Sequence, residues 1–211
     1  MRRTFLAGAL GTLVASRPHA QADGSSTRSD FESPVAFQPI LTGKGGPVTW
    51  NVIDDPTAPA GPKVLVQTST DKTDYRFPLA VFDQPVLRDV DVAVRFKPVS
   101  GEVDRAAGIA VRLVDRDNYY VVRANALEDN VRLYRVVKGD RQQFAGANVK
   151  VQSGIWQELR LVARGSRFEV FFEGRSLFSA VDTTFATAGR VALWTKADSV
   201  TSFDDLRIGG L

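Results

Sequence analysis

Arginine and aromatic side chains recur at alternate positions in one strand-rich stretch of the chain, Gly108–Lys138. Its three β-type runs are Gly108–Val114, Tyr119–Ala124 and Val131–Lys138, and each alternates apolar and polar residues. A period of two gives every strand a core face and a second face. The residues expected on that second face are Arg112, Arg123, Arg132 and Tyr134. Guanidinium forks beside an aromatic ring suit ligands rich in hydroxyl or carboxylate groups.

Two further segments extend this surface. In Arg190–Lys196, Val191 and Leu193 are expected in the core, which puts alternate side chains on the second face. The complete predicted ligand-binding set, on the concave face of a curved sheet, is Arg112, Arg123, Asn125, Arg132, Tyr134, Trp194 and Lys196. A second interpretation stays open, in which this is an ordinary solvated sheet face whose arginine stems cover the aromatic rings.

The N-terminus has the pattern of an export signal. Arg2 and Arg3 precede an apolar run from Phe5 to Ala15, and small residues follow at Ala20-Gln21-Ala22. This pattern predicts a signal peptide over residues 1–22, cleaved before Asp23, and the run is too short to span a bilayer. The paired arginines fit a twin-arginine signal as well as a general secretory one. We therefore expect a periplasmic or extracellular protein.

The composition narrows the chemistry available after export. The signal contains three of the 27 basic residues and none of the 24 acidic ones, so charges balance in the remainder. A balanced chain has no global attraction to nucleic acid. Cysteine is absent and the only histidine, His19, lies in the signal. Catalytic sites built on histidine or cysteine, and zinc sites of these ligands, are thereby excluded from the exported chain.

Short strands separated by tight turns dominate the rest of the chain, and no stretch has a clear helical period. Pro78 is expected to restrict Arg76–Phe82 to an edge or irregular strand, and Val181–Ala186 allows at most one helical turn. Besides the three runs within Gly108–Lys138, the expected strands are Phe37–Ile40, Val48–Val52, Lys63–Thr68, Arg76–Phe82, Asp89–Lys97, Arg141–Ala145, Trp156–Ala163, Arg167–Phe172, Leu177–Val181, Arg190–Thr195 and Val200–Ile208. This pattern predicts an all-β jelly roll of two curved antiparallel sheets over residues 31–211, after a flexible leader at 23–30.

Three blocks of the sequence carry a family resemblance. The specific block runs from Gly108 to Tyr134 and includes the string Asp117-Asn118-Tyr119-Tyr120. Weaker blocks are Trp156 to Phe178, with spaced glycines, and Asp182 to Leu206, with Leu193-Trp194-Thr195-Lys196. Together they resemble the 3-keto-disaccharide hydrolase domain family. The resemblance implies a secreted concanavalin A-like sandwich that engages carbohydrate. We separately expect a monomer without a membrane span.

The resemblance leaves three functions open: a sugar-binding domain, an active 3-keto-glycoside hydrolase, and a structural or protein-interaction module. For the enzyme, it implies an oxyanion-stabilising cation among Arg112, Arg123 and Lys196. The base would come from Glu128, Asp129 or Asp198, and no residue is assigned as catalytic. A family 16 type glucanase is not expected, because in the nearest string, Glu102-Val103-Asp104-Arg105-Ala106-Ala107, alanine replaces the final glutamate.

Acidic residues suggest a structural calcium ion at two places, although no metal ligand is assigned. Asp115-Arg116-Asp117-Asn118 begins like a calcium loop but lacks its glycine and distal glutamate, so a β-turn is favoured there. Asp204-Asp205 is the second candidate, with capping or pairing to an arginine as the alternative.

Overall fold

A computed structural model describes residues 26–211; the expected signal peptide, residues 1–22, lies outside this range. The described residues form strands and turns, and they contain no helix long and apolar enough to span a membrane. The strands are β1 (Ser26–Ser29), β2 (Phe37–Gly43), β3 (Trp50–Asp54), β4 (Lys63–Gln67), β5 (Arg76–Phe82), β6 (Val90–Ser100), β7 (Ala106–Asp115), β8 (Asn118–Asn125), β9 (Asn130–Val137), β10 (Asp140–Asn148), β11 (Gln157–Arg164), β12 (Arg167–Phe172), β13 (Arg175–Val181), β14 (Arg190–Trp194) and β15 (Val200–Gly210).

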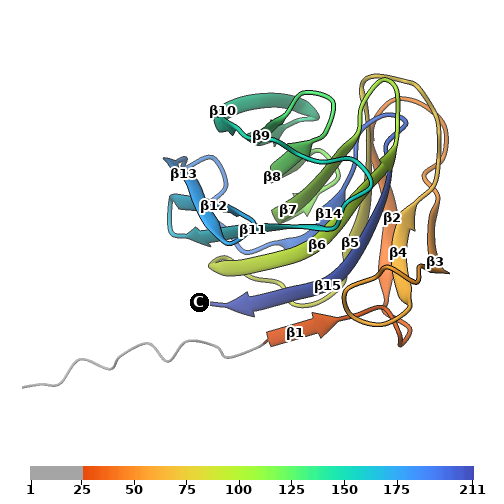
Figure 1. The fold of residues 1–211 in the computed structure, drawn as a ribbon. Helices are drawn as coiled ribbons and strands as arrows, with labels where there is room; N and C mark the ends of the chain where they lie inside the picture. The colour runs from red at the N-terminus through yellow and green to blue at the C-terminus, as the bar shows by residue number, and fades with distance from the viewer. Residues whose placement is uncertain (1–25) are drawn as a thin grey trace, which may run out of the picture.

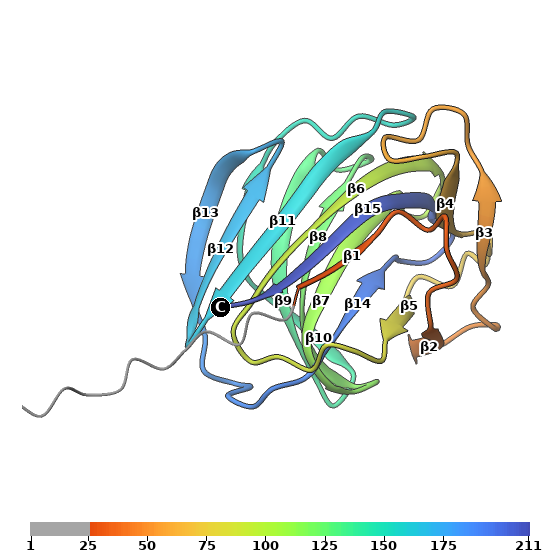
Figure 2. The same cartoon turned by 90° about the horizontal axis from the view of Figure 1, so that it is seen from below.

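The strands build two packed antiparallel sheets, which confirms the predicted jelly-roll sandwich (Figure 1). The eight-stranded sheet has the order β13-β12-β11-β6-β15-β4-β3, and β1 pairs with the far part of β15. The seven-stranded sheet has the order β10-β9-β8-β7-β14-β5-β2. Figure 2 shows the eight-stranded sheet from outside, with β1 lying along β15.

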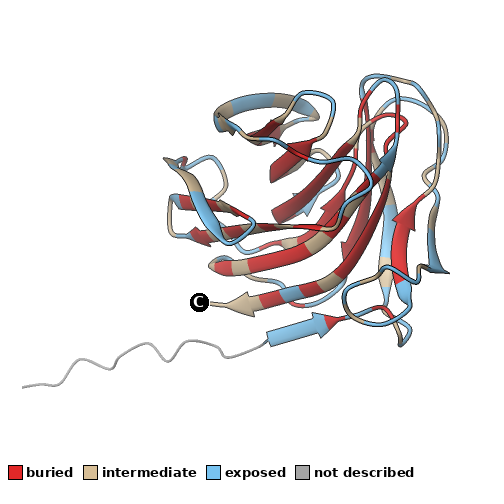
Figure 3. Ribbon diagram, in the orientation of Figure 1, coloured by how far each residue is buried: buried red, intermediate tan, exposed pale blue. Residues whose placement is uncertain are grey.

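Alternating side chains explain why the two sheets pack. In β6, Val92, Val94 and Phe96 point into the space between the sheets, whereas Asp91 and Arg95 are partly exposed on the outer side. Valine and phenylalanine favour strands and bury apolar area against the opposite sheet. The resulting interlayer core draws residues from both sheets, and buried segments dominate the middle strands of both layers (Figure 3).

The seven-stranded sheet also buries its other face, called the concave face below. A second apolar cluster covers it, including Phe77, Leu79, Val121 and Trp194. The sheet curls so strongly that Arg141, on the edge strand β10, lies 4.9 Å from the Phe77 ring on β5. Those two strands are separated by four others in the sheet. Strong curvature therefore closes a face that a flat antiparallel sheet would leave in water.

Three local expectations differ from the structure. Ser26–Ser29, expected to lie in a flexible leader, is strand β1, because β4 pairs with only the first part of β15 and leaves the rest of that edge free. Arg76–Phe82, expected to be an edge or irregular strand, is internal between β14 and β2. Pro78 is tolerated because the pairing with β14 ends at Leu79. Val181–Ala186 contains no helical turn.

Candidate functional site

Six of the seven predicted binding residues share the concave face of the seven-stranded sheet. Arg123 and Arg132 are direct partners across β8 and β9, which places both side chains on one side of the sheet. Tyr134 and Trp194 belong to the buried apolar cluster of that face. Asn125 and Lys196 both reach Asp104 at one end of it. Their binding role remains a prediction, whereas their proximity is an observation.

Arg112 is the exception, and its expected face is wrong. The pairing of β7 with β8 shifts register between Val111 and Asp115, and Arg112 there has a φ of 49°. A bulge of this kind breaks the alternation. Val111 accordingly points into the interlayer core, and Leu113 into the cluster on the concave face. The Arg112 guanidinium lies 5.4 Å from the Phe168 ring, which is part of the interlayer core.

The partners of Arg112 assign it a structural role. Its guanidinium donates to the carbonyl oxygens of Arg88 at 2.8 Å, Phe185 at 3.0 Å and Gly165 at 2.6 Å. These three acceptors belong to three separate loops of the sandwich. Because Arg112 is almost fully buried, its donors are committed to these loops and do not face a ligand.

The aromatic part of the concave face is closed. Trp194 is fully buried and stacks on Phe77 with ring centroids 5.4 Å apart. The Arg141 guanidinium lies 4.5 Å from the Tyr134 ring and 5.8 Å from the Trp194 ring, so it covers both. Trp194 therefore offers no exposed stacking platform in this conformation. The predicted open groove and the alternative solvated face both differ from this packed arrangement.

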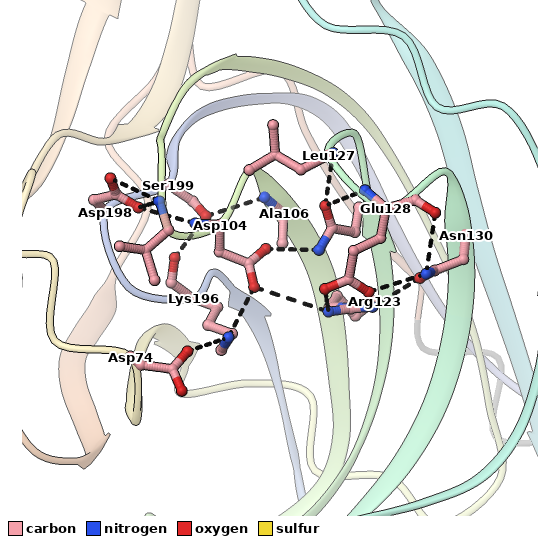
Figure 4. Close-up of polar contacts among 12 residues, drawn as sticks. Asp74, Asp104, Ala106, Arg123, Leu127, Glu128, Asn130, Lys196, Asp198 and Ser199 are labelled. Carbon is pink, nitrogen blue, oxygen red and sulfur yellow. Dashed lines mark hydrogen bonds and ion pairs between the residues drawn. The ribbon is translucent and has the colours of Figure 1, made fainter.

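A charged cluster occupies the polar end of the concave face, where the apolar cover ends (Figure 4). Asp104 is buried on the loop between β6 and β7, and its carboxylate lies 3.0 Å from Lys196 Nζ and 3.9 Å from Arg123. Asn125 donates to the same carboxylate at 2.8 Å. Lys196 also binds the exposed Asp74 at 2.5 Å. Asp104 is thus the hub of a network that joins separate loops and strands.

Glu128 forms the exposed side of this cluster. Arg123 Nη2 lies 2.8 Å from the Glu128 carboxylate and 2.7 Å from Asn130 Oδ1. Asn130 also donates to Glu128 at 3.0 Å. The Glu128 side chain is 50% exposed, while Arg123 is almost completely buried. A ligand in solvent can therefore reach the carboxylate of Glu128 while Arg123 holds it in place.

The pKa values of two carboxylates in the cluster, Asp104 and Glu128, shift in opposite directions. Burial raises the pKa of Asp104, although Arg123 and Lys196 oppose this effect. Partial burial also disfavours the charged form of Glu128, but hydrogen bonds from Arg123 and Asn130 outweigh it and lower its pKa to about 2. Burial opposes the charge on Lys196, yet Asp74 and Asp104 together raise its pKa. At neutral pH Glu128 is a fixed negative charge and a weak base.

Two of the three residues considered as bases are held by structural contacts. Asp198 accepts backbone N–H groups from Glu102, Val103 and Asp104, at distances from 2.8 to 3.2 Å, and so shapes that loop. Asp129 pairs with Lys150 at 2.9 Å on the surface.

Sequence reasoning did not assign Asp104 and Arg141 to the site. Asp104 lies in the loop between β6 and β7, where strand periodicity does not indicate which way a side chain points. Arg141 reaches the concave face only because the sheet curls.

The acidic pairs considered for calcium have other partners. Asp115 accepts the Asp117 N–H at 2.8 Å and the Asn118 amide at 2.9 Å, which is a turn. Asp204 accepts N–H groups from Ala60 and Asp205, and is fully buried. Across residues 26–211 no three acidic, histidine or cysteine residues cluster in a way that could hold a metal ion. A calcium ion at either place therefore stays a prediction, with turn formation and backbone capping as the contacts observed.

Comparison with known proteins identifies the fold. Protein-family models and curated proteins yield no match to this chain. Among solved structures, the carbohydrate-binding module CBM66 from Bacillus subtilis is similar with a TM-score of 0.61 and 17% identity, over 80% of this chain and 94% of the module. The cellulose induced protein Cip1 matches with a TM-score of 0.59 and 14% identity, over 86% and 96% of the two chains. A Bacillus licheniformis β-glucanase matches with a TM-score of 0.58 and 10% identity, over 89% of this chain and 98% of the glucanase. The fold is the concanavalin A-like jelly roll.

Proposed function

We propose that this protein is an exported carbohydrate-binding domain whose ligand contacts the polar end of the concave face. The observation that carries the proposal is the mixed cluster of Asp74, Glu128, Asn130 and Lys196 around the buried Asp104–Arg123 pair. Sugar hydroxyl groups both donate and accept hydrogen bonds, so they pair with ammonium donors and carboxylate acceptors alike. The fold supports the same class, since its structural neighbours include a carbohydrate-binding module and a β-glucanase.

The charge of the cluster favours a neutral sugar. Two cationic groups, Arg123 and Lys196, face three carboxylates, Asp74, Asp104 and Glu128. A carboxylated ligand would therefore meet a surplus of negative charge at short range. Neutral hydroxyl groups avoid this cost and still use the exposed oxygens of Asp74 and Glu128.

Glu128→Gln tests the binding site, because it removes the charge and keeps the shape. We expect retention of a neutral glycan ligand, found on an array and measured by affinity electrophoresis, to weaken by roughly tenfold, about 1.4 kcal/mol. Glu169→Gln is the matched control, since Glu169 lies on β12 of the other sheet and pairs with Arg167. Equal binding by the wild type and both variants would contradict the assignment, and an array without any ligand would contradict the function.

The export part of the proposal has a separate test. The arginine pair followed by an apolar run supports export to the periplasm or beyond the cell. N-terminal sequencing of the secreted protein should give Asp23 as its first residue. A start well beyond Asp23, or retention of Met1, would contradict the expected cleavage.

A second candidate function is cleavage of 3-keto-glycosides, the activity implied by the family resemblance. The observation that favours it is Asp104, a carboxyl whose pKa burial raises, beside Lys196 and Arg123. A carboxylate whose pKa is raised is a stronger base toward the proton next to a ketone, and adjacent cations stabilise the resulting oxyanion. Turnover of a 3-keto disaccharide by the wild type, lost in Asp104→Asn but not in Glu169→Gln, would support it. If the wild type does not turn over the substrate, the hydrolase function is contradicted and the binding function is the one that stays.

A further inference from the structure

A hollow lies on the outer face of the eight-stranded sheet, where residues of β1, β6, β11 and β15 line it. Figure 2 shows these four strands side by side. Its floor is Ala93 on β6, which is the direct partner of Arg160 on β11 and of Arg207 on β15. Arg28 on β1 is in turn the direct partner of Arg207. Directly paired residues share a face, so one small residue stands in a row of three arginines. The missing side-chain volume at Ala93 creates the hollow.

The cavity has a volume of about 510 Å³, within the range of ~300–1,000 Å³ typical of small-ligand sites. Backbone and side chains from four strands line it. The lining residues used below are Arg28, Asp91, Ala93, Glu158, Arg160 and Arg207. Gly209 also contributes to the surface and leaves the space beside β1 without a side chain.

Each arginine of the row is held by a carboxylate beneath it. Arg160 makes a two-pronged pair with Asp91 at 2.7 and 2.5 Å, and its guanidinium also lies 4.9 Å from the Phe171 ring. Arg207 pairs with Glu158. Such contacts fix the guanidinium planes before any ligand arrives, which lowers the entropic cost of binding.

The exposed groups are mainly the cations. The side chains of Arg160, Arg207 and Arg28 are 39–67% exposed, whereas their acidic partners Asp91, Glu158 and Asp205 are only 17–28% exposed. The hollow thus presents mainly N–H donors of the arginines toward solvent, with carboxylate oxygens at its sides. A ligand that fits has a negatively charged group for the arginines and hydroxyl donors for the carboxylates.

We propose that this outer hollow is a second ligand site, for the carboxylated sugars of a uronic-acid oligosaccharide. The carboxylate of the sugar pairs with Arg160 and Arg207 above Ala93, and its hydroxyl groups donate to Asp91 and Glu158. Simple anions such as phosphate supply the negative charge for the arginines, but at neutral pH they bring few hydrogen-bond donors for the carboxylates. This site is independent of the neutral-sugar site on the concave face, since it lies on the other sheet.

Ala93→Leu tests the hollow without any change of charge. We expect isothermal titration of the purified protein with an oligogalacturonate to show binding by the wild type and at least roughly tenfold weaker binding by Ala93→Leu. Ala93→Ser keeps the floor small and should bind like the wild type. A neutral oligosaccharide of equal length should bind this site at least tenfold more weakly. Oligogalacturonate binding that is unchanged in Ala93→Leu, or undetectable in the wild type, overturns the proposal.

Charge-matched variants separate a specific site from diffuse attraction. Arg160→Gln should weaken oligogalacturonate binding by roughly tenfold, whereas Arg167→Gln, an exposed arginine on β12 outside the hollow, should leave it unchanged. Equal weakening by both variants, or inorganic phosphate binding as tightly as the oligogalacturonate, overturns the assignment. Glu128→Gln should not affect this titration, so the two proposed sites succeed or fail separately. Thermal melting confirms that each variant is folded.

Discussion

Asp182 shows how one buried carboxylate fastens parts of both sheets. It directly follows β13 and accepts the Tyr120 hydroxyl at 2.6 Å and an Arg135 N–H at 2.6 Å, from β8 and β9. The Thr184 N–H adds a third bond at 2.8 Å. Burial disfavours its charge, but the bonds from Thr184, Tyr120 and Arg135 outweigh this and lower its pKa from 3.8 to about 2.

The lowered pKa of Asp182 predicts acid sensitivity of the fold. A group with a lower pKa in the folded state stabilises it above the unfolded value, and this contribution disappears as the pH falls through the folded value. The free energy of unfolding should therefore decrease by about 2 kcal/mol between pH 4 and pH 2 from this group. Urea titrations at several pH values measure it.

Asp182→Asn identifies the source of that pH dependence. The variant should be less stable than the wild type at pH 7, and the two should converge near pH 2. Asp140→Asn is the control, because the Asp140 carboxylate accepts a hydrogen bond from Gln142 on an exposed hairpin. Parallel stability curves for the wild type and Asp182→Asn across this range would refute the assignment.

At the scale of elements, the bulge in β7 predicts that Arg112 is needed for folding. Three partly buried carbonyl oxygens would lose their charged donor in Arg112→Ala, and a hydrogen bond to a charged group contributes roughly 1.5–3 kcal/mol. We expect a loss of at least about 3 kcal/mol in the free energy of unfolding. Arg112→Lys should not restore it, because an ammonium cannot reproduce the planar fork. Arg116→Ala, at an exposed neighbour, should melt like the wild type; a similarly stable Arg112→Ala would contradict this role.

The same bulge marks the limit of prediction from sequence. Strand alternation was sufficient to place Arg123, Arg132 and Tyr134 on one face, because period two follows directly from backbone geometry. Arg112 lies in the same stretch but has a left-handed backbone that its sequence does not signal. That conformation is stabilised by carbonyl groups from distant loops. Local periodicity cannot report contacts that depend on such long-range packing.

The curvature of the seven-stranded sheet is a second feature that the sequence does not predict. The sequence predicted that Trp194 lies on the second face, and it does, but not that this face is buried. The cover comes from Arg141, which the chain places far from Trp194 and which the curl of the sheet brings within 5.8 Å. Asp104 was missed for a related reason, since its partners Lys196 and Arg123 meet it only in three dimensions.

At the scale of the whole molecule, one core joins the two sheets and should make them unfold together. Phe168 on β12 lies 4.6 Å from Tyr120 on β8 and 6.1 Å from Phe144 on β10, measured between ring centroids. Phe168→Ala should therefore cost about 3–5 kcal/mol through the cavity it leaves. The sheets share this core, so tryptophan fluorescence and far-ultraviolet circular dichroism should report one coincident urea transition at a lower midpoint. Phe168→Leu should lose less free energy of unfolding than Phe168→Ala. Two separate transitions in the wild type would show that the sheets are not one cooperative unit.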